Sequence, residues 1–452
     1  MRSCRRDAFA SAAGSLAVPG GLCFGRKELP FIKSVPCGAR VAYRKHAWAA
    51  LLGGIYSGAI FPFYLVIARS ELKASPLLIS CMTAAPFVGN LFALFWANAM
   101  EGRPKMPFAA GSWVVARALL ILMVVAFTPF RFAIIVCVSQ FLATVASPAY
   151  AAIMKDIYPD AHRGRIMAYI SFVGQFTQIT TALVVGVVLS SRQGHHLWFL
   201  HTSPQNYRWV FPIGAAVGVV SALIFWLVPT SGPSREERTS KRPTHEFLLS
   251  AFSILSEDRN FRWFALSVFT FGFGNLLLLP VVPIFQVDRL HIRPMQVAAL
   301  STTTSAVWMV SYLYWGRYVD TRSPLRATAI SVFLTLLNPL IYTAAVYVPN
   351  VWMLAPAAVI GGVSSAGIDL GYFNSVLRFA DERRVSHYQA LFSCLLGVRG
   401  SVAPFIGGAL QQAVQREGWD FTFIFLFAAA IMSAGAMMQV LGVRRQKLSQ
   451  RA

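Results

Sequence analysis

Residues 47–68 read AWAALLGGIYSGAIFPFYLVIA and contain no Asp, Glu, Lys or Arg. The hydrocarbon core of a bilayer is about 30 Å thick, so a helix needs roughly 20 apolar residues to cross it. Eleven further runs of similar length and character follow along the chain. We therefore expect an all-α integral membrane protein with twelve spans, near 47–68, 76–98, 107–128, 131–153, 166–190, 209–229, 263–286, 295–316, 326–347, 351–377, 387–413 and 420–442.

The composition supports the same class of protein. Hydrophobic residues make up 56% of the 452 residues and charged residues only 13%, whereas soluble domains carry about 25% charged residues. So few charges cannot cover the surface of a soluble protein of this size, but they suit a surface that faces lipid. The six cysteines show no metal-ligand spacing, and no Gly-rich phosphate-binding motif occurs. We expect no metal and no cofactor.

The net charge of +22 follows from the distribution of the basic residues. With the N-terminus placed inside, 30 of the 40 Lys and Arg residues lie in inner segments and eight in outer loops. Such an excess is the positive-inside signal of membrane proteins. It predicts that both termini are cytoplasmic, and it explains the charge without a nucleic-acid partner. We expect the location to be the inner membrane of a bacterium.

The segments outside the spans divide the chain into two halves, 47–229 and 263–442. Residues 1–46 form a basic stretch that we expect to be a disordered cytoplasmic tail; a start codon set too early and a transit peptide are the alternatives. The linker 230–262 carries apolar residues at helical spacing, which predicts a short amphipathic helix at the inner membrane face. Residues 443–452 form a basic cytoplasmic tail.

The two halves repeat each other at a fixed spacing. Glu101 and Asp320 are 219 residues apart, as are Arg103 and Arg322. Arg163 lies 220 residues before Arg383. Duplicated six-helix halves are a common plan among transporters.

These loops resemble those of the major facilitator superfamily. The stretch Gly316-x-x-x-Asp320-x-Arg322 is similar to the family's signature between helices 8 and 9, although Thr321 stands where a basic residue is usual. The first copy is more degraded, with Ala97 in place of Gly and Glu101 in place of Asp. The resemblance covers roughly residues 45–445. It implies a transporter fold in which helices 1, 4, 7 and 10 line a central cavity, helices 2, 5, 8 and 11 help to form it, and helices 3, 6, 9 and 12 stand outside.

The loop charges predict gating contacts on the cytoplasmic face. An acid at a helix end is stabilised by the N-terminal end of a neighbouring helix, and nearby Arg residues can pair with it. Such a cluster can latch one conformation and release it in another; ordinary surface ion pairs, which contribute little, are the alternative. The candidate gating residues are Gly316, Asp320, Arg322, Glu101, Arg103, Arg163 and Arg165.

Three ionisable residues lie inside predicted spans, where charge is costly and commonly functional. Asp369 is a candidate proton-coupling carboxylate, and Arg399 a candidate anchor for an anionic substrate group. Since their predicted depths are similar, a static Asp369–Arg399 ion pair is the alternative for both. Arg117 lies in helix 3, which the resemblance places outside the cavity, so a structural role is expected for it.

Neutral polar residues in other spans could orient a substrate, although each alone is more often an interhelical hydrogen bond. Helix 11 also contains small residues and a proline that could act as a hinge. The polar candidates are Gln178, Gln175, Asn275, Tyr56, Tyr64, Gln140 and Asn374, and the hinge candidates are Gly400, Pro404 and Gly407.

Together these features predict a monomeric secondary transporter. It would move a small solute by alternating access, coupled to protons or another ion, with the lipid bilayer as its other partner. A transporter-fold receptor or assembly factor is the alternative function. A membrane-embedded enzyme is disfavoured, because such enzymes usually gather His, Asp or Glu around a site. The histidines here lie in predicted loops or at the ends of predicted helices.

Overall fold

The computed structural model describes residues 39–100, 103–158, 160–190, 196–197, 200–201, 204–230, 253–379 and 385–449. Regular structure in this part of the chain is helical, apart from the short antiparallel pair of β1 (His196–Leu197) and β2 (Leu200–His201). The predicted all-α class is confirmed.

The first half of the chain contributes the helices up to Trp226. They are α1 (Arg40–Ile60), α2 (Tyr64–Ser70), α3 (Pro76–Leu91), α4 (Ala93–Ala99), η3 (Pro107–Gly111), α5 (Ser112–Ile121), η4 (Leu122–Val125), α6 (Pro129–Ile157), α7 (Asp160–Leu189), η5 (Pro204–Asn206) and α8 (Tyr207–Trp226).

The second half contributes the remaining helices. They are α10 (Arg259–Asp288), α11 (Pro294–Thr321), α12 (Pro324–Thr335), α13 (Leu337–Tyr347), η6 (Val351–Leu354), α14 (Ala355–Phe379), α15 (Val385–Glu417) and α16 (Phe421–Ser449).

Every predicted span coincides with a helix or with consecutive helices. Ten stretches of the described residues are long and apolar enough to cross a membrane. The other two predicted spans correspond to α3 with α4, which is interrupted at Phe92, and to α11, whose 28 residues include the polar run 301–305. The structure is therefore consistent with twelve spans.

Two boundaries differ from the predicted ones. Helix α1 begins at Arg40, inside the predicted tail 1–46, and buries Tyr43 and His46. Helix α16 continues to Ser449, through most of the predicted tail 443–452. The length of an apolar run underestimates the length of a helix whose end carries Arg and Lys, because such an end extends beyond the hydrocarbon core of the bilayer. The predicted amphipathic helix of the linker falls mainly on 231–252, outside the described residues; residues 253–257 are helical.

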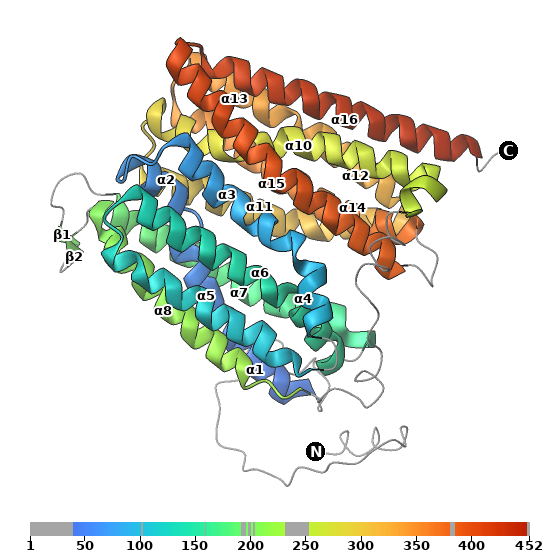
Figure 1. The fold of residues 1–452 in the computed structure, drawn as a ribbon, viewed down its shortest axis with the longest axis horizontal. Helices are drawn as coiled ribbons and strands as arrows, with labels where there is room; N and C mark the ends of the chain where they lie inside the picture. The colour runs from blue at the N-terminus through green and yellow to red at the C-terminus, as the bar shows by residue number, and fades with distance from the viewer. Residues whose placement is uncertain are drawn as a thin grey trace, which may run out of the picture.

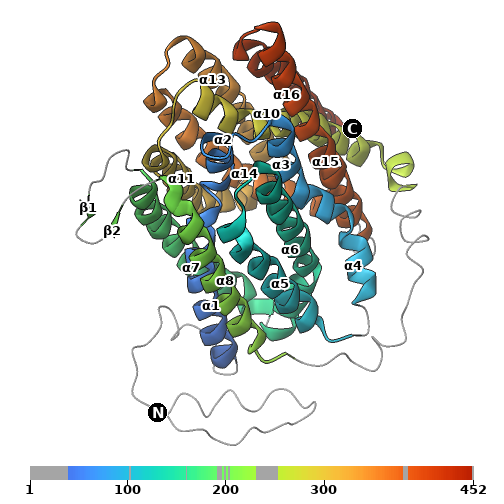
Figure 2. The same cartoon turned by 60° about the vertical axis from the view of Figure 1, so that its left-hand side comes forward.

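The helices form two groups that lie side by side (Figures 1 and 2). In the first group α1 packs on α7 and α8; in the second α10 packs on α15 and α16. The groups meet where α3 packs along α15 and where α7 packs along α11. By the order of the spans, α3 corresponds to α11 and α7 corresponds to α15, so the internal repeat relates these two contacts to each other.

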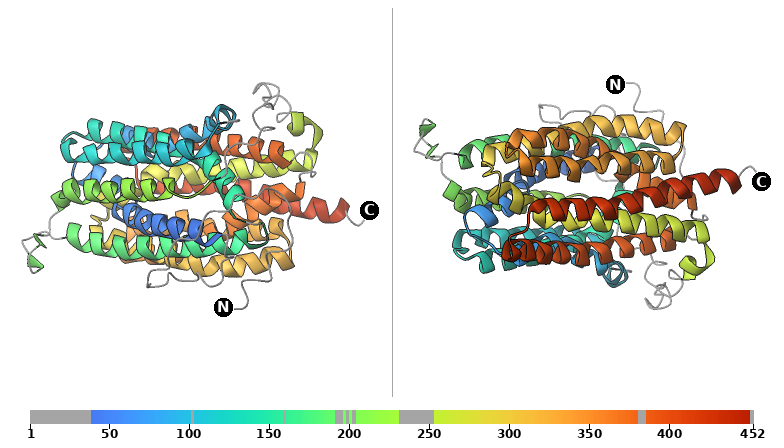
Figure 3. Two further views of the ribbon diagram at one scale, coloured as in Figure 1. Left: turned by 90° about the horizontal axis from the view of Figure 1, so that it is seen from below. Right: turned by 90° about the horizontal axis from the view of Figure 1, so that it is seen from above.

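The bundle has two distinct ends. The start of α1 and the end of α16 lie at one end, here called the terminal end, and the β1–β2 pair lies at the other, the hairpin end (Figure 3). The end of α2, the starts of α3 and α11 and the end of α10 also belong to the hairpin end, which Figure 1 shows at the left.

The buried core differs between these ends. One large apolar cluster contains residues of both halves, such as Phe63 and Phe211 with Phe285 and Phe425. Toward the terminal end the clusters separate: one contains only first-half residues, from Ala39 to Val228, and another only second-half residues, from Ile254 to Phe392. Because helices in a bilayer associate through close side-chain packing, the shared cluster indicates that the two halves are held together mainly at the hairpin end.

Candidate functional site

A cavity of about 500 Å³, here called the central cavity, lies along the inner side of the first half, where it meets the second half at Trp308. Helices α1, α5, α6, α7 and α8 form most of its wall, and α11 closes it from the second half with Trp308. The lining combines aromatic, amide, hydroxyl and cationic groups. Its polar and aromatic side chains are His46, Tyr56, Ser57, Phe61, Trp113, Arg117, Gln140, Tyr150, Ser171, Gln175, Gln178, Ser221, Phe225 and Trp308.

Four of the polar residues predicted from the sequence line this cavity: Tyr56, Gln140, Gln175 and Gln178. Ser57 Oγ donates to Gln178 Oε1 at 3.2 Å, which ties α1 to α7. Tyr64 lies next to the cavity, in a small recess that it shares with Phe61 and Gln140.

Arg117 of α5 lines the cavity. The prediction that it lies outside the cavity was wrong. Its Nη1 donates to the Gly218 carbonyl at 2.7 Å and to Ser221 Oγ at 3.0 Å. The guanidinium carbon stands 4.8 Å from the Tyr56 ring centroid and 5.2 Å from that of Trp113. The family's division into cavity-lining and outer helices places α5 outside. It does not take account of the length of an Arg side chain, which reaches the cavity from an outer helix.

His46 was missed because the sequence places it at the edge of the first apolar run. It is 4% exposed. Its Nδ1 lies 3.1 Å from the Tyr158 hydroxyl and its Nε2 3.2 Å from the Tyr150 hydroxyl. A neutral imidazole donates through one nitrogen and accepts through the other, so the two tyrosines hold the ring by both sides. The signal that could have found it is the presence of Tyr43 and His46 three residues apart, on one face of a helix.

Asp369 of α14 is connected to the cavity through a tryptophan. The Trp308 indole Nε1 donates to Asp369 Oδ2 at 3.1 Å, and Trp308 also lines the cavity. Every other carboxylate of the described helices lies within a few residues of a helix end. Asp369 is thus the acid best placed to respond to the contents of the cavity.

Arg399 of α15 does not pair with Asp369, so the alternative of a static ion pair between them was wrong for the described structure. Its Nη1 donates to the Val268 carbonyl of α10. The guanidinium fills the space beside Gly272, where a Cβ atom would come within 1.8 Å of Nη1. The side chain therefore ties α15 to α10, and it does not reach the lining of the central cavity.

The remaining predicted residues lie elsewhere. Asn275 is exposed and Asn374 Nδ2 donates to Leu370 O of its own helix at 2.8 Å; neither lines the central cavity. Gly400 packs against Phe87 of the other half, and Gly407 against the Leu277 carbonyl of α10. Helix α15 runs unbroken past Pro404. A hinge at these positions stays a prediction.

The predicted latch at the terminal end is not formed among the described residues. Asp320, Arg322 and Arg103 are exposed and make no ion pair with another described residue. A Cβ atom at Gly316 would meet open space. Glu101 lies outside the described residues, as do the side chains of Arg163 and Arg165.

An ion pair that the sequence analysis did not predict joins the halves at the hairpin end. Arg69 Nε donates to Asp288 Oδ1 at 2.8 Å, and Nη2 pairs with Oδ2. Arg69 Nη1 donates to Ala74 O at 2.8 Å, and the amide of Gln415 donates to Asp288 Oδ2 at 3.4 Å. A bidentate contact of this kind fixes geometry as well as charge. Arg69 and Asp288 are 219 residues apart, the same spacing as the loop repeat, and that equivalence could have found them.

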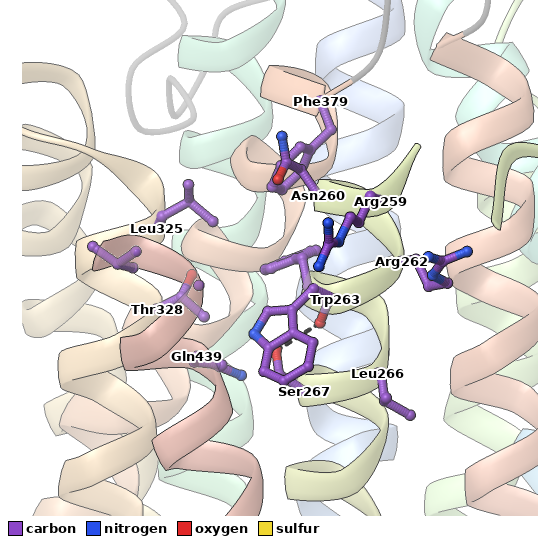
Figure 4. A pocket seen from close by; sticks show the side chains of 13 residues that line it. Arg259, Asn260, Arg262, Trp263, Leu266, Ser267, Leu325, Thr328, Phe379 and Gln439 are labelled. Carbon is purple, nitrogen blue, oxygen red and sulfur yellow. Dashed lines mark hydrogen bonds between the residues drawn. The ribbon is translucent and has the colours of Figure 1, made fainter. Parts of the chain in front are cut away.

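A second cavity, of about 800 Å³, lies within the second half at the terminal end. Trp263, Ser267, Thr328 and Gln439 line it, and Arg259 stands at its edge (Figure 4). The Trp263 indole donates to Met438 O at 2.9 Å and so joins α10 to α16. Its lining comes from the second half alone, so it does not lie between the halves.

The model of one protein family, the Major Facilitator Superfamily, matches residues 47–343. The chain belongs to the Major Facilitator Superfamily. This confirms the resemblance seen in the loop motifs. A comparison with curated protein sequences finds no significant match.

Solved structures of other transporters share the fold of this superfamily member. A mutant form of the nucleoside transporter NupG matches with a TM-score of 0.69 and 12% identity, covering 89% of this chain and 99% of its own. A bacterial homologue of the human lysosomal transporter Spinster, in an inward-facing and unoccupied conformation, matches with a TM-score of 0.63 and 15% identity. The match covers 94% of this chain and 98% of that one. A D-xylose–proton symporter matches with a TM-score of 0.62 and 12% identity, covering 88% of this chain and 96% of its own. At such identities the likeness concerns the fold.

Proposed function

We propose that this protein is a secondary transporter that moves a small solute across the membrane by alternating access. The observation that carries the proposal is a polar and aromatic cavity at the meeting of two halves that share a core at one end only. A solute in such a cavity reaches one side of the membrane, and rocking of the halves, 47–229 and 263–442, would expose it to the other. The cavity volume lies within the usual range of small-molecule sites.

The terminal end faces the cytoplasm in this proposal. The excess of Lys and Arg in the loops of that end supports the orientation. The hairpin end would then be the outer gate, closed by Arg69 and Asp288. Breaking this ion pair and the adjoining apolar contacts is the step that would open the cavity to the outside.

Protons are the coupling ion in this proposal, with Asp369 as the group that binds them. Two observations support it: the carboxylate lies within a span, and Trp308 connects it to the cavity lining. The printed name of one structural neighbour, a D-xylose–proton symporter, gives an example of proton coupling in this fold. A protonated Asp369 accepts a weaker hydrogen bond from the indole, so proton binding would free Trp308 to move.

Flux in proteoliposomes tests the proposal. Purified protein is reconstituted with an imposed pH gradient, and uptake of labelled solutes is followed with and without a protonophore. We expect gradient-driven accumulation, and its loss in Asp369→Asn while downhill exchange continues. Glu417→Gln, a change at an exposed acid at the end of α15, is the matched control and should keep accumulation. A protein that moves no solute in either direction would contradict the transport function.

A further inference from the structure

We propose that the transported solute is a small organic anion and that Arg117 binds its carboxylate or phosphate oxygens. This inference rests on the proposed function and names its substrate class. It departs from the sequence analysis, which assigned anion binding to Arg399 and a structural role to Arg117.

The charge of the cavity is the first argument. Arg117 contributes a full positive charge to the lining, and none of the lining residues within the described part of the chain is Asp or Glu. Arg117 makes no ion pair with a described residue. An unpaired charge in a region shielded from water is costly, and a ligand of opposite sign relieves that cost. A cationic solute would add to the repulsion instead.

The hydrogen bonds of Arg117 are the second argument. Only Nη1 is engaged, by Gly218 O and Ser221 Oγ. Nε and Nη2 donate to no described residue, and neither nitrogen is shut off from the cavity as the buried, unpartnered Nε of Arg399 is. These two nitrogens form the edge of the guanidinium that matches a carboxylate or phosphate in two places.

The surroundings hold that edge in position. Tyr56 and Trp113 both lie within cation–π distance of the guanidinium. Ser221 donates its own proton to Ala49 O at 2.7 Å, so its oxygen is left to accept from Arg117. A Cβ atom at Gly218 would come within 2.7 Å of the Tyr56 ring and 3.1 Å of Arg117 Cδ. Glycine at 218 is therefore required for the side chain to lie here, and the anion site is already formed before ligand binds.

The rest of the lining describes the body of the solute. Gln175 and Gln178 can donate and accept hydrogen bonds, and the Gln175 Oε1 is buried with no protein partner among the described residues. Trp113, Tyr150 and Trp308 present flat apolar surfaces. A planar or partly apolar molecule with one oxyanion group and one further polar group fits this lining best.

Binding to the purified full-length protein tests the inference. The probes are benzoate, indole-3-acetate, glycerol 3-phosphate and lactate, each compared with a neutral counterpart: benzamide, indole-3-acetamide, glycerol and lactamide. Thermal stabilisation reports binding of every probe, and quenching of tryptophan fluorescence reports binding of the probes without an indole ring. We expect at least one anion to bind while its neutral counterpart does not. Arg117→Gln should weaken that anion's binding about tenfold to hundredfold, as expected for a hydrogen-bonded charge, and Arg117→Lys should weaken it less.

Arg262→Gln is the matched control, since Arg262 lines the other basic cavity (Figure 4). Monodispersity in detergent shows whether each variant folds. Loss of binding in Arg262→Gln but not in Arg117→Gln would overturn the inference, as would a panel in which no anion binds. Accumulation of a neutral or cationic solute, unchanged in Arg117→Gln, would overturn the anion assignment and leave transport standing. Absence of all flux would instead contradict the proposed function.

Discussion

The hairpin end and the terminal end of this protein are built from the same membrane-spanning helices, yet they are held together differently. At the hairpin end, residues of both halves form one apolar core and share the Arg69–Asp288 ion pair. At the terminal end each half keeps its own core. The difference teaches that the contacts between the halves, rather than the halves themselves, distinguish one face of the membrane from the other.

The largest effect is expected from locking the hairpin end. Ser190 Oγ accepts a hydrogen bond from the Met295 amide, so the two halves touch there. With native cysteines removed, Ser190→Cys with Met295→Cys should cross-link on oxidation and abolish flux, because the outer gate could not open. Flux assays before and after reduction check this. Each single-cysteine variant should stay active, and full activity of the oxidised pair would mean that this end does not open.

A smaller effect is expected from the ion pair itself. The side chains of Arg69 and Asp288 are 17% and 27% exposed, and loss of hydrogen bonds to a charged group costs about 2 kcal/mol. Asp288→Asn should therefore shift the population toward the open hairpin end by about tenfold or more. Alkylation of an engineered cysteine below the gate measures this shift. Restored protection in the charge-swapped pair Arg69→Asp with Asp288→Arg would confirm a direct contact.

An added methyl group between the halves at the hairpin end should also favour the open state of that end. A Cβ atom at Gly408 would come within 2.0 Å of Ser80 Oγ and 3.1 Å of the Pro76 carbonyl, both in the other half. Gly408→Ala should cost the closed state about 1–3 kcal/mol, the usual cost of overpacking. The same alkylation assay applies. Gly111→Ala, where a Cβ would come no closer than 3.5 Å to the Trp226 ring, is the control within the first half and should leave accessibility unchanged.

The smallest effect concerns the separate core of the first half. Tyr158→Phe removes the hydroxyl that lies against His46 Nδ1. We expect a loss of about 1–2 kcal/mol in stability, typical of one buried polar group left without its partner, with no change in alkylation at the hairpin end. Thermal unfolding in detergent measures the stability. A change in gate accessibility would indicate that the two ends are coupled through this core.

The sequence is sufficient to predict the fold, because apolar run length and loop charge depend on bilayer thickness and not on packing. Every predicted span coincides with helical structure. Four of the polar cavity residues were also predicted, because polar side chains are unusual in hydrocarbon: Tyr56, Gln140, Gln175 and Gln178.

The roles of the two arginines could not be predicted, and the reason is rotational. A run of apolar residues gives the depth of Arg117 and Arg399 but not the direction in which each side chain points. In the structure Arg399 turns into the contact between α15 and α10, and Arg117 turns toward Tyr56 and the cavity. The Arg69–Asp288 pair was missed for a related reason, because both residues lie at helix ends where charges are common.

Distance measurements across both ends test the central claim most directly. The protein is reconstituted in proteoliposomes with spin labels at the exposed positions Lys73 and Arg289 of the hairpin end and, separately, at Arg103 and Thr321 of the terminal end. With a transported solute and a pH gradient, the first distance should lengthen in the fraction of molecules in which the second shortens. Distances that stay single and unchanged at both ends, in protein that still transports, would contradict the account.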